Sequence, residues 1–150
     1  MNEGKILVET HPIGSVSEEQ LAYAVICALM NGKLVCVKHH CRESWEIPGG
    51  RREMGESILA AAERELFEET GAMDFTINEI CDYSVSINQM KSYGRLYRAV
   101  ITAALPLPAF EIKEISLFDK LPEPLTYPEI QPLLLRVAWP RFEKPTVEYP

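Results

Sequence analysis

The sequence has little of what several classes of protein need. Its longest uncharged apolar stretch, Leu21–Met30, is too short for a membrane-spanning helix. No basic region precedes an apolar run near the N-terminus, so no secretory signal is visible. Basic residues number 15 against 22 acidic ones, which disfavours binding to duplex nucleic acid through its phosphates. We therefore expect a cytoplasmic protein that binds neither membranes nor duplex nucleic acid.

Cysteine is scarce, and its spacing is typical of neither a zinc site nor a disulfide scaffold. The four cysteines, at positions 27, 36, 41 and 81, include no Cys-x-x-Cys pair. Reduced thiols are therefore expected. Cys27 and Cys36 lie in apolar strand-like runs and are predicted to be buried, whereas Cys41 lies in a polar stretch and is predicted to be exposed.

The order of predicted elements indicates a layered domain. With 150 residues, 47% of them hydrophobic, the chain can form the core of one domain spanning 1–150. Hydrophobic patterning predicts strands at 5–9, 21–30, 33–37, 45–47, 75–87, 95–105 and 115–118. It predicts helices at 57–70 and 133–139. Strands, helix, strands and helix in this order indicate an α+β or α/β domain.

Two local signals fix turns and helix ends. Asn31-Gly32 between apolar runs predicts a hairpin, because a type I′ turn needs positive φ at both central positions. Ser57 and Gly71 are suited to the N-cap and the C′ position of the first helix.

The end of this helix carries an unfavourable concentration of negative charge. Glu65, Glu68 and Glu69 share one face, where like charges repel by roughly 0.2–0.5 kcal/mol per pair. They also lie at the negative end of the helix dipole. Such a face is often only solvated surface. Here Gly49-Gly50 upstream allows close backbone approach to a ligand. Together these features favour a site for hard divalent cations, which prefer carboxylate oxygens.

Further residues complete a known pattern. Its fixed positions are Gly50, Glu56 and Arg64-Glu65-Leu66-x-Glu68-Glu69-x-Gly71-Ala72. This segment resembles the complete Nudix box, with Ala72 where the family usually has a bulkier aliphatic residue. The segments 45–50 and 117–122 resemble the family's flanking sequences. The chain thus resembles Nudix hydrolases, and their MutT-type branch in particular, over most of its length.

The resemblance implies an α+β fold in which a mixed sheet lies between helices as an α/β/α sandwich. It also implies hydrolysis of a pyrophosphate linkage in a nucleotide derivative with Mg²⁺ or Mn²⁺. By position, Glu65 would be a metal ligand or the base that activates water, Arg64 would orient it, and Glu56 would support the cluster. The implied catalytic residues are Arg64, Glu65, Glu68 and Glu69. The implied metal ligands are Gly50, Glu65, Glu68, Glu69 and, beyond the box, Glu114, with Glu111 as second choice.

The substrate follows by elimination within the resemblance. Ile87 and Asn88 occupy the places where the ADP-ribose branch has proline, and the pattern of the coenzyme A branch is absent. This favours a nucleoside triphosphate, cleaved to a monophosphate and pyrophosphate, with an oxidised purine as one target by analogy. Two alternatives stay open. One is another nucleoside diphosphate derivative (ADP-ribose, a nucleotide sugar or a dinucleoside polyphosphate), and the other is a non-catalytic nucleotide-binding module.

Several residues near the box have both a structural and a functional interpretation. Arg51 and Arg52 could meet phosphates or be surface charges. Trp45 could stack on a base or belong to the core. His39 and His40 are unsuited to a joint metal site, because adjacent strand residues face opposite sides. The oligomeric state, including a homodimer, is left open.

Overall fold

The computed structural model describes residues 5–106 and 112–142. In chain order the elements are β1 (Ile6–His11), the 3-10 helix η1 (Glu18–Gln20), β2 (Leu21–Met30), β3 (Lys33–His39), β4 (Gly49–Arg51), α1 (Ile58–Thr70), β5 (Ala72–Ile87), β6 (Met90–Ala104), β7 (Ile112–Phe118), α2 (Gln131–Ala138) and the 3-10 helix η2 (Pro140–Phe142).

The strands form one mixed sheet in the order β1-β5-β6-β2-β3-β7. β2 runs parallel to β6 along one edge and is antiparallel to two strands along the other. Its last two residues pair with β3, while Tyr23, Ala24 and Val25 pair with β4. β4 therefore lies against the middle of the sheet although it has only three residues.

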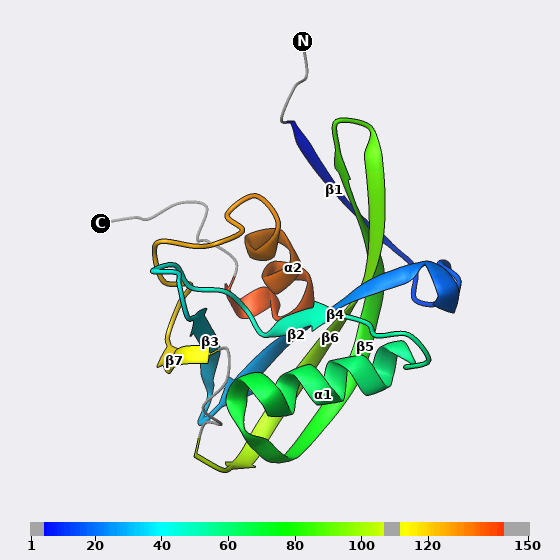
Figure 1. Cartoon of the computed structure of the whole chain (residues 1–150). Helices are drawn as coiled ribbons and strands as arrows, with labels where there is room; N and C mark the ends of the chain where they lie inside the picture. Colours follow the sequence, from blue (N-terminus) through cyan, green and yellow to red (C-terminus); the bar gives the residue numbers. More distant parts are fainter. Residues whose placement is uncertain (1–4, 107–111, 143–150) are drawn as a thin grey trace.

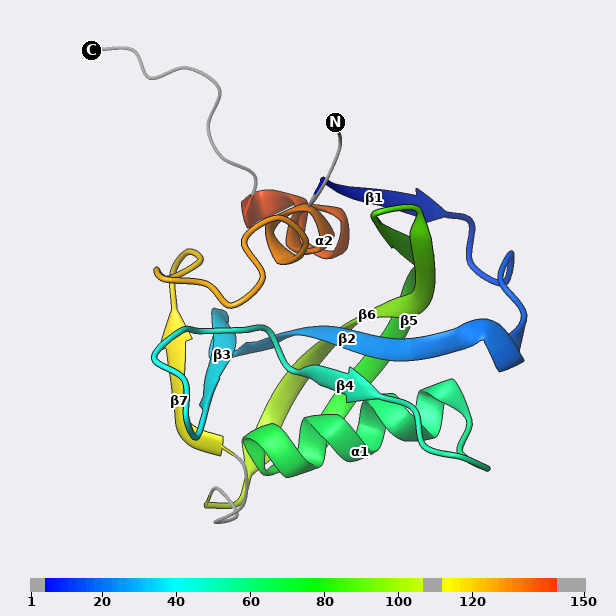
Figure 2. The same cartoon turned by 45° about the horizontal axis from the view of Figure 1, so that its top comes forward.

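The two helices cover opposite faces of this sheet. Figure 2 shows α1 on one side of β2 and β4 and α2 on the other. The long hairpin of β5 and β6 extends beyond the helices, with β1 along its outer edge (Figure 1). The arrangement confirms the expected α+β sandwich with a mixed sheet between helices.

Each face of the sheet has its own buried cluster, because side chains alternate between faces along a strand. On the α1 side, Ile58, Ala62 and Leu66 of the helix pack against the sheet. On the α2 side, Leu134, Leu135 and Ala138 do the same. Ala61 and Ala62 are fully buried and small, so α1 can lie close to β2 and β4.

The local signals at turns and caps are confirmed. Asn31 and Gly32 have φ of 53° and 75°, as a type I′ turn requires. The Ser57 hydroxyl accepts a hydrogen bond from the Ala60 N–H at the start of α1. Gly71 ends the helix in the left-handed region with φ of 77°.

The prediction of a strand at 45–47 is wrong. Trp45 and Glu46 form only isolated bridges, and the strand is β4, which begins at Gly49. Strand propensity is poor for Gly-Gly, but here glycine is required: a Cβ on Gly49 would collide with the Ala24 carbonyl of β2. β6 also begins five residues earlier than predicted, since Asn88 and Gln89 form a tight turn with positive φ.

The burial of the cysteines agrees with expectation. All four thiols are free; Cys27 and Cys36 are buried and Cys41 is exposed. Among residues 5–106 and 112–142, no helix is long and apolar enough to span a bilayer.

Candidate functional site

The acidic residues of the second half of α1 lie beside the backbone of β4. Close packing of the helix on the sheet brings Glu65 directly over Gly50. A Cβ at Gly50 would collide with the Glu65 carboxylate, so glycine lets this side chain lie against the β4 backbone in its present position. Glu68 is half-exposed, whereas Glu69 is almost fully buried. The three carboxylates therefore span the range from solvent to interior.

Arg64 connects this cluster to the loop before the helix. Its Nε and Nη2 donate to both oxygens of Glu56, at 2.6 and 3.0 Å, and its Nη1 donates to Glu68 at 3.1 Å. Nη2 also donates to the Arg51 carbonyl, and Nη1 lies 3.6 Å from Oε1 of Glu65. The two-point hydrogen bonding with Arg64 lowers the pKa of Glu56 to about 2. Arg64 thus contacts Glu65 and Glu68, two of the three glutamates predicted to be catalytic.

Glu69 is held by groups from two other segments. Its Oε1 accepts a hydrogen bond from the Gly49 N–H at 3.0 Å. Its Oε2 lies 3.1 Å from Nε2 of His39, on β3. Burial raises the pKa of the Glu69 carboxyl, and these two contacts only partly offset that effect.

The same imidazole nitrogen also faces a second buried carboxylate. Nε2 of His39 lies 3.1 Å from Oε1 of Glu46, whose Oε2 accepts from Arg42 at 3.0 Å. This nitrogen is buried and has no aligned hydrogen bond, since one N–H cannot point at both Glu46 and Glu69. The Glu46 and then the Glu69 carboxylate raise the pKa of His39 to about 10. Burial alone would raise the pKa of Glu46, but His39 and Arg42 lower it.

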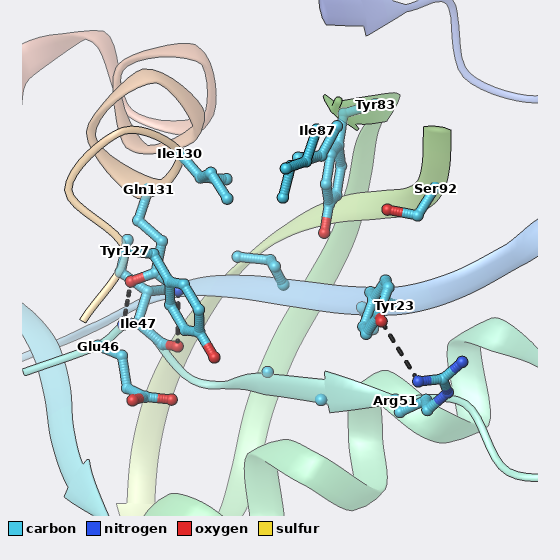
Figure 3. Close-up of a pocket in the computed structure, with 15 residues that line it drawn as sticks. Tyr23, Glu46, Ile47, Arg51, Tyr83, Ile87, Ser92, Tyr127, Ile130 and Gln131 are labelled. Carbon is cyan, nitrogen blue, oxygen red and sulfur yellow. Dashed lines mark hydrogen bonds between the residues drawn. The ribbon is translucent and has the colours of Figure 1, made fainter. Parts of the chain in front are cut away.

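A cavity of about 310 Å³ lies on the other side of β4. Three tyrosines surround it, from β2, β5 and the segment before α2, with Glu46 and Arg51 at opposite sides of the view in Figure 3. Aliphatic side chains form much of the remaining wall. The lining includes Tyr23, Tyr83, Tyr127, Val25, Val85, Ile87 and Ile130. The size and the aromatic lining suit a flat ring system.

The polar groups of this pocket differ in how many hydrogen bonds they already make within the protein. Gln131 is fixed, since its Oε1 accepts from the Ile47 N–H at 2.8 Å and its Nε2 donates to the Ile47 carbonyl. Arg51 donates to the Tyr23 hydroxyl at 3.3 Å and lies over its ring. The hydroxyls of Tyr83 and Ser92 project toward the same part of the cavity (Figure 3).

Of the two arginines predicted to contact substrate, only Arg51 lines the pocket. Arg52 donates to three backbone carbonyls, those of Leu21, Glu56 and Glu19, at 2.8, 3.1 and 3.1 Å. Its guanidinium therefore ties β2, the loop before α1 and η1 together. A phosphate contact of either arginine stays a prediction.

Trp45 and Glu114 lie away from the carboxylates of α1. Trp45 is buried and packs edge-on against Phe118 with ring centroids 4.8 Å apart, in the α2-side cluster. Lys38 lies over the Trp45 ring and pairs with Glu114 at 3.9 Å. Glu114 thus belongs to the face of the sheet opposite α1, and the structure does not bring it to Glu69. Glu111, the second choice, lies outside the described residues.

The sequence interpretation gave no role to His39, Glu46 or the pocket tyrosines. Of the two adjacent histidines, only His39 reaches the carboxylates, and His40 is exposed. A register irregularity between Lys38 and His39 accompanies this orientation. The available signal in the sequence was a histidine at the end of the strand before the glycine pair. That signal does not place His39 beside Glu69, because its position depends on the pairing of β3 with segments far away in the sequence.

The donor set fits a hard divalent cation. Within the part of the chain that the structure describes, no three His, Cys, Asp or Glu side chains are arranged as a metal site. Arg64 donates a hydrogen bond to Glu68, and Nε2 of His39 lies beside Glu69. Glu65 and Glu68 are nevertheless oxygen donors of the kind that Mg²⁺ prefers, and Glu65 lies against a glycine backbone.

Comparison with protein families matches residues 20–123 to the model described as NUDIX domain. Over 60 residues the chain is 33% identical to the 8-oxo-dGDP phosphatase NUDT18 of Mus musculus. That alignment covers 37% of this chain and 19% of the mouse protein, so the chain matches about a fifth of that relative's length.

Two solved structures share most of the fold. The Bacillus subtilis pyrophosphohydrolase BsRppH, solved as a mutant, has a TM-score of 0.68 and 26% identity over 81% of this chain and 78% of that one. A MutT NUDIX hydrolase from Burkholderia pseudomallei has a TM-score of 0.57 and 22% identity over 77% of this chain and 95% of that one.

Proposed function

The chain belongs to the NUDIX domain family, and on this premise we propose that it is a metal-dependent pyrophosphohydrolase of nucleotide derivatives. The substrate that we propose is a nucleoside triphosphate, cleaved to a monophosphate and pyrophosphate. One observation carries the proposal: the carboxylates of α1 and an aromatic pocket lie on the two sides of the same three-residue strand, β4.

The two sides of β4 would bind the two halves of a nucleotide. The pocket has apolar and aromatic walls, which suit a nucleobase, and the cationic Arg51 at its rim suits a phosphate. The acidic cluster alone would repel a polyphosphate. With divalent cations bound, that cluster becomes a binding site for the pyrophosphate linkage.

Each residue of the cluster then has a distinct task. Glu68 and Glu69 would bind the cation, and Glu65, lying against Gly50, would be a further ligand or would accept the proton of the attacking water. Arg64 keeps the acidic side chains together through its hydrogen bonds. A bound Mg²⁺ or Mn²⁺ supplies neutralisation of the polyphosphate charge and acidification of water.

The name of the mouse relative supports an oxidised purine as the base and adds a second candidate substrate. That protein is an 8-oxo-dGDP phosphatase by name, so an oxidised purine nucleoside diphosphate is a candidate beside the triphosphate. The two substrates would give different products: pyrophosphate from a triphosphate, and inorganic phosphate from a diphosphate.

The test compares isosteric variants on one helix. Glu68→Gln and Glu69→Gln should each lower Mg²⁺-stimulated turnover by at least about a hundredfold, because they remove a charged ligand. Glu63→Gln, an exposed carboxylate of the same helix, is the control and should retain wild-type turnover. Far-UV circular dichroism checks the fold. Unchanged turnover in both test variants would refute the roles assigned to these residues.

A substrate panel decides between the candidates. Ordinary and oxidised purine nucleoside triphosphates and diphosphates, ADP-ribose, a nucleotide sugar and a dinucleoside polyphosphate are each incubated with Mg²⁺ and with Mn²⁺. We expect the triphosphates to give pyrophosphate at the highest kcat/KM. Binding of nucleotides without turnover of any of them would favour the non-catalytic alternative.

A further inference from the structure

His39 lies between the two sides of the candidate site. It comes from the end of β3, and its Nε2 is 3.1 Å from a Glu46 oxygen and 3.1 Å from a Glu69 oxygen. Glu46 lines the aromatic pocket, whereas Glu69 belongs to the acidic cluster of α1.

Two groups contact the Glu69 carboxylate among the residues that the structure describes. The Gly49 N–H fixes Oε1, and Nε2 of His39 faces Oε2. The side chain is buried, so water cannot replace a lost partner readily. A glutamate with three side-chain torsions otherwise samples several rotamers. The hydrogen bond to Oε1 and the charge contact at Oε2 together favour one orientation of the carboxylate.

The imidazole is itself held in place by Glu46. Oε2 of Glu46 accepts a hydrogen bond from Arg42, which leaves Oε1 facing His39. The chain of contacts therefore runs from Arg42 through Glu46 and His39 to Glu69. Partners of this kind behind a metal ligand typically change metal affinity by about 10–100-fold when they are lost.

We propose that His39 is a positioning residue: its Nε2 holds the Glu69 carboxylate in the orientation that binds the divalent cation, and Glu46 anchors the imidazole. The inference rests on the proposed function, because it takes Glu69 as a metal ligand. It adds a residue outside the helix and the glycine pair to the machinery of the site.

The test uses two neutral amides of different reach. The amide of His39→Gln extends to the position of Nε2, whereas that of His39→Asn ends near Nδ1 and falls short of Glu69. Binding of Mn²⁺ without nucleotide is followed by the electron paramagnetic resonance signal of the free ion. We expect His39→Asn to weaken Mn²⁺ binding by about 10-fold or more. His39→Gln should stay within about threefold of the wild type.

Turnover gives a second readout. His39→Asn should lower kcat more than it changes KM for the nucleotide, because the pocket itself is intact. The matched control is His40→Asn, an exposed neighbour that should behave as wild type in both assays. Equal losses in His39→Gln and His39→Asn, or wild-type Mn²⁺ affinity in His39→Asn, would overturn the positioning role.

A further variant keeps the test decisive if His39→Asn does not fold. Glu46→Gln loosens the imidazole but leaves it in place, so Mn²⁺ binding should weaken by a few-fold; unchanged Mn²⁺ affinity contradicts the proposal. The two proposals fail separately. A wild-type protein that neither binds Mn²⁺ nor hydrolyses any nucleotide refutes the proposed function, whereas an active wild type with an equally active His39→Asn refutes only the role of His39.

Discussion

Two buried carboxylates in this molecule, those of Asp82 and Glu69, differ greatly in how many hydrogen bonds they accept. Asp82 of β5 is fully buried and accepts four hydrogen bonds. The N–H groups of Gly14 and Val16 donate at 3.1 and 3.0 Å, and Arg95 donates twice, at 2.6 and 3.3 Å. Glu69 is nearly as buried but accepts one aligned hydrogen bond and shares an imidazole with another acid.

The difference separates a structural charge from a functional one. A fully satisfied buried carboxylate stabilises one conformation; here Asp82 ties the loop after β1 to the β5–β6 hairpin. A buried carboxylate with few donors carries an uncompensated cost of burial, and a bound ligand can relieve it. Glu69 is of the second kind.

The largest expected effect comes from breaking the Asp82 cluster. Asp82→Asn removes the buried charge opposite Arg95 and leaves the partly buried guanidinium with only the more distant carboxylate of Glu79, 3.6 Å away. We expect a loss of about 3–5 kcal/mol in the free energy of unfolding, measured by urea denaturation. Asp74→Asn, an exposed aspartate of the same strand, should stay within about 0.5 kcal/mol of the wild type. Equal stability of the two variants would contradict a structural role for Asp82.

A smaller, pH-dependent effect is expected at Glu56, which has an arginine partner as Asp82 does but lies near the surface. Its pKa in the folded protein is lowered to about 2 by Arg64, below that of an unfolded glutamate. The ionised form is therefore favoured by folding, and its contribution is fully present above about pH 4.5 and is lost as pH falls toward 2.

Glu56→Gln should thus be less stable than the wild type at pH 7, and the gap should narrow steadily below about pH 4.5. Denaturation curves of both proteins between pH 2 and 7 measure this. Glu63→Gln, with an exposed carboxylate, should show no comparable trend. A gap of constant size across the range would mean that the Arg64 pairing does not favour the ionised form.

The smallest effect on stability is expected at Glu69 itself. Glu69→Gln keeps an acceptor for the Gly49 N–H, and the imidazole of His39 retains Glu46 as its partner. The free energy of unfolding should therefore change by less than about 1 kcal/mol, although turnover is lost. A destabilisation as large as that of Asp82→Asn would remove the distinction between the two carboxylates.

The sequence predicted the parts of the fold and site that depend on local chemistry. The Asn31-Gly32 turn and both caps of α1 follow from backbone preferences of single residues. The shared face of Glu65, Glu68 and Glu69 follows from the helical period. Each of these features is decided within a few positions of chain, so one sequence suffices to find it.

Features that depend on pairing between distant segments were missed. Patterning favoured 45–47 over β4, because Gly49 is a strand residue through its pairing with Val25 of β2 and its close approach to the Ala24 carbonyl. The role of His39 required knowing that β3 ends near the last turn of α1. Alternation along a strand tells which residues share a face, but not which helix covers that face.

The division of one edge of β2 between two partners has a dynamic consequence. β3 and β4 bond to different stretches of this edge, so separation of the segment from Pro48 to Arg52 from β2 would leave the β2–β3 hairpin closed. Local opening of such a short segment needs less free energy than unfolding of the sheet. Amide protons of β4 should therefore exchange with solvent long before those of β2 that face β6. The strand that separates the acidic cluster from the aromatic pocket is therefore expected to open locally while the rest of the sheet stays folded.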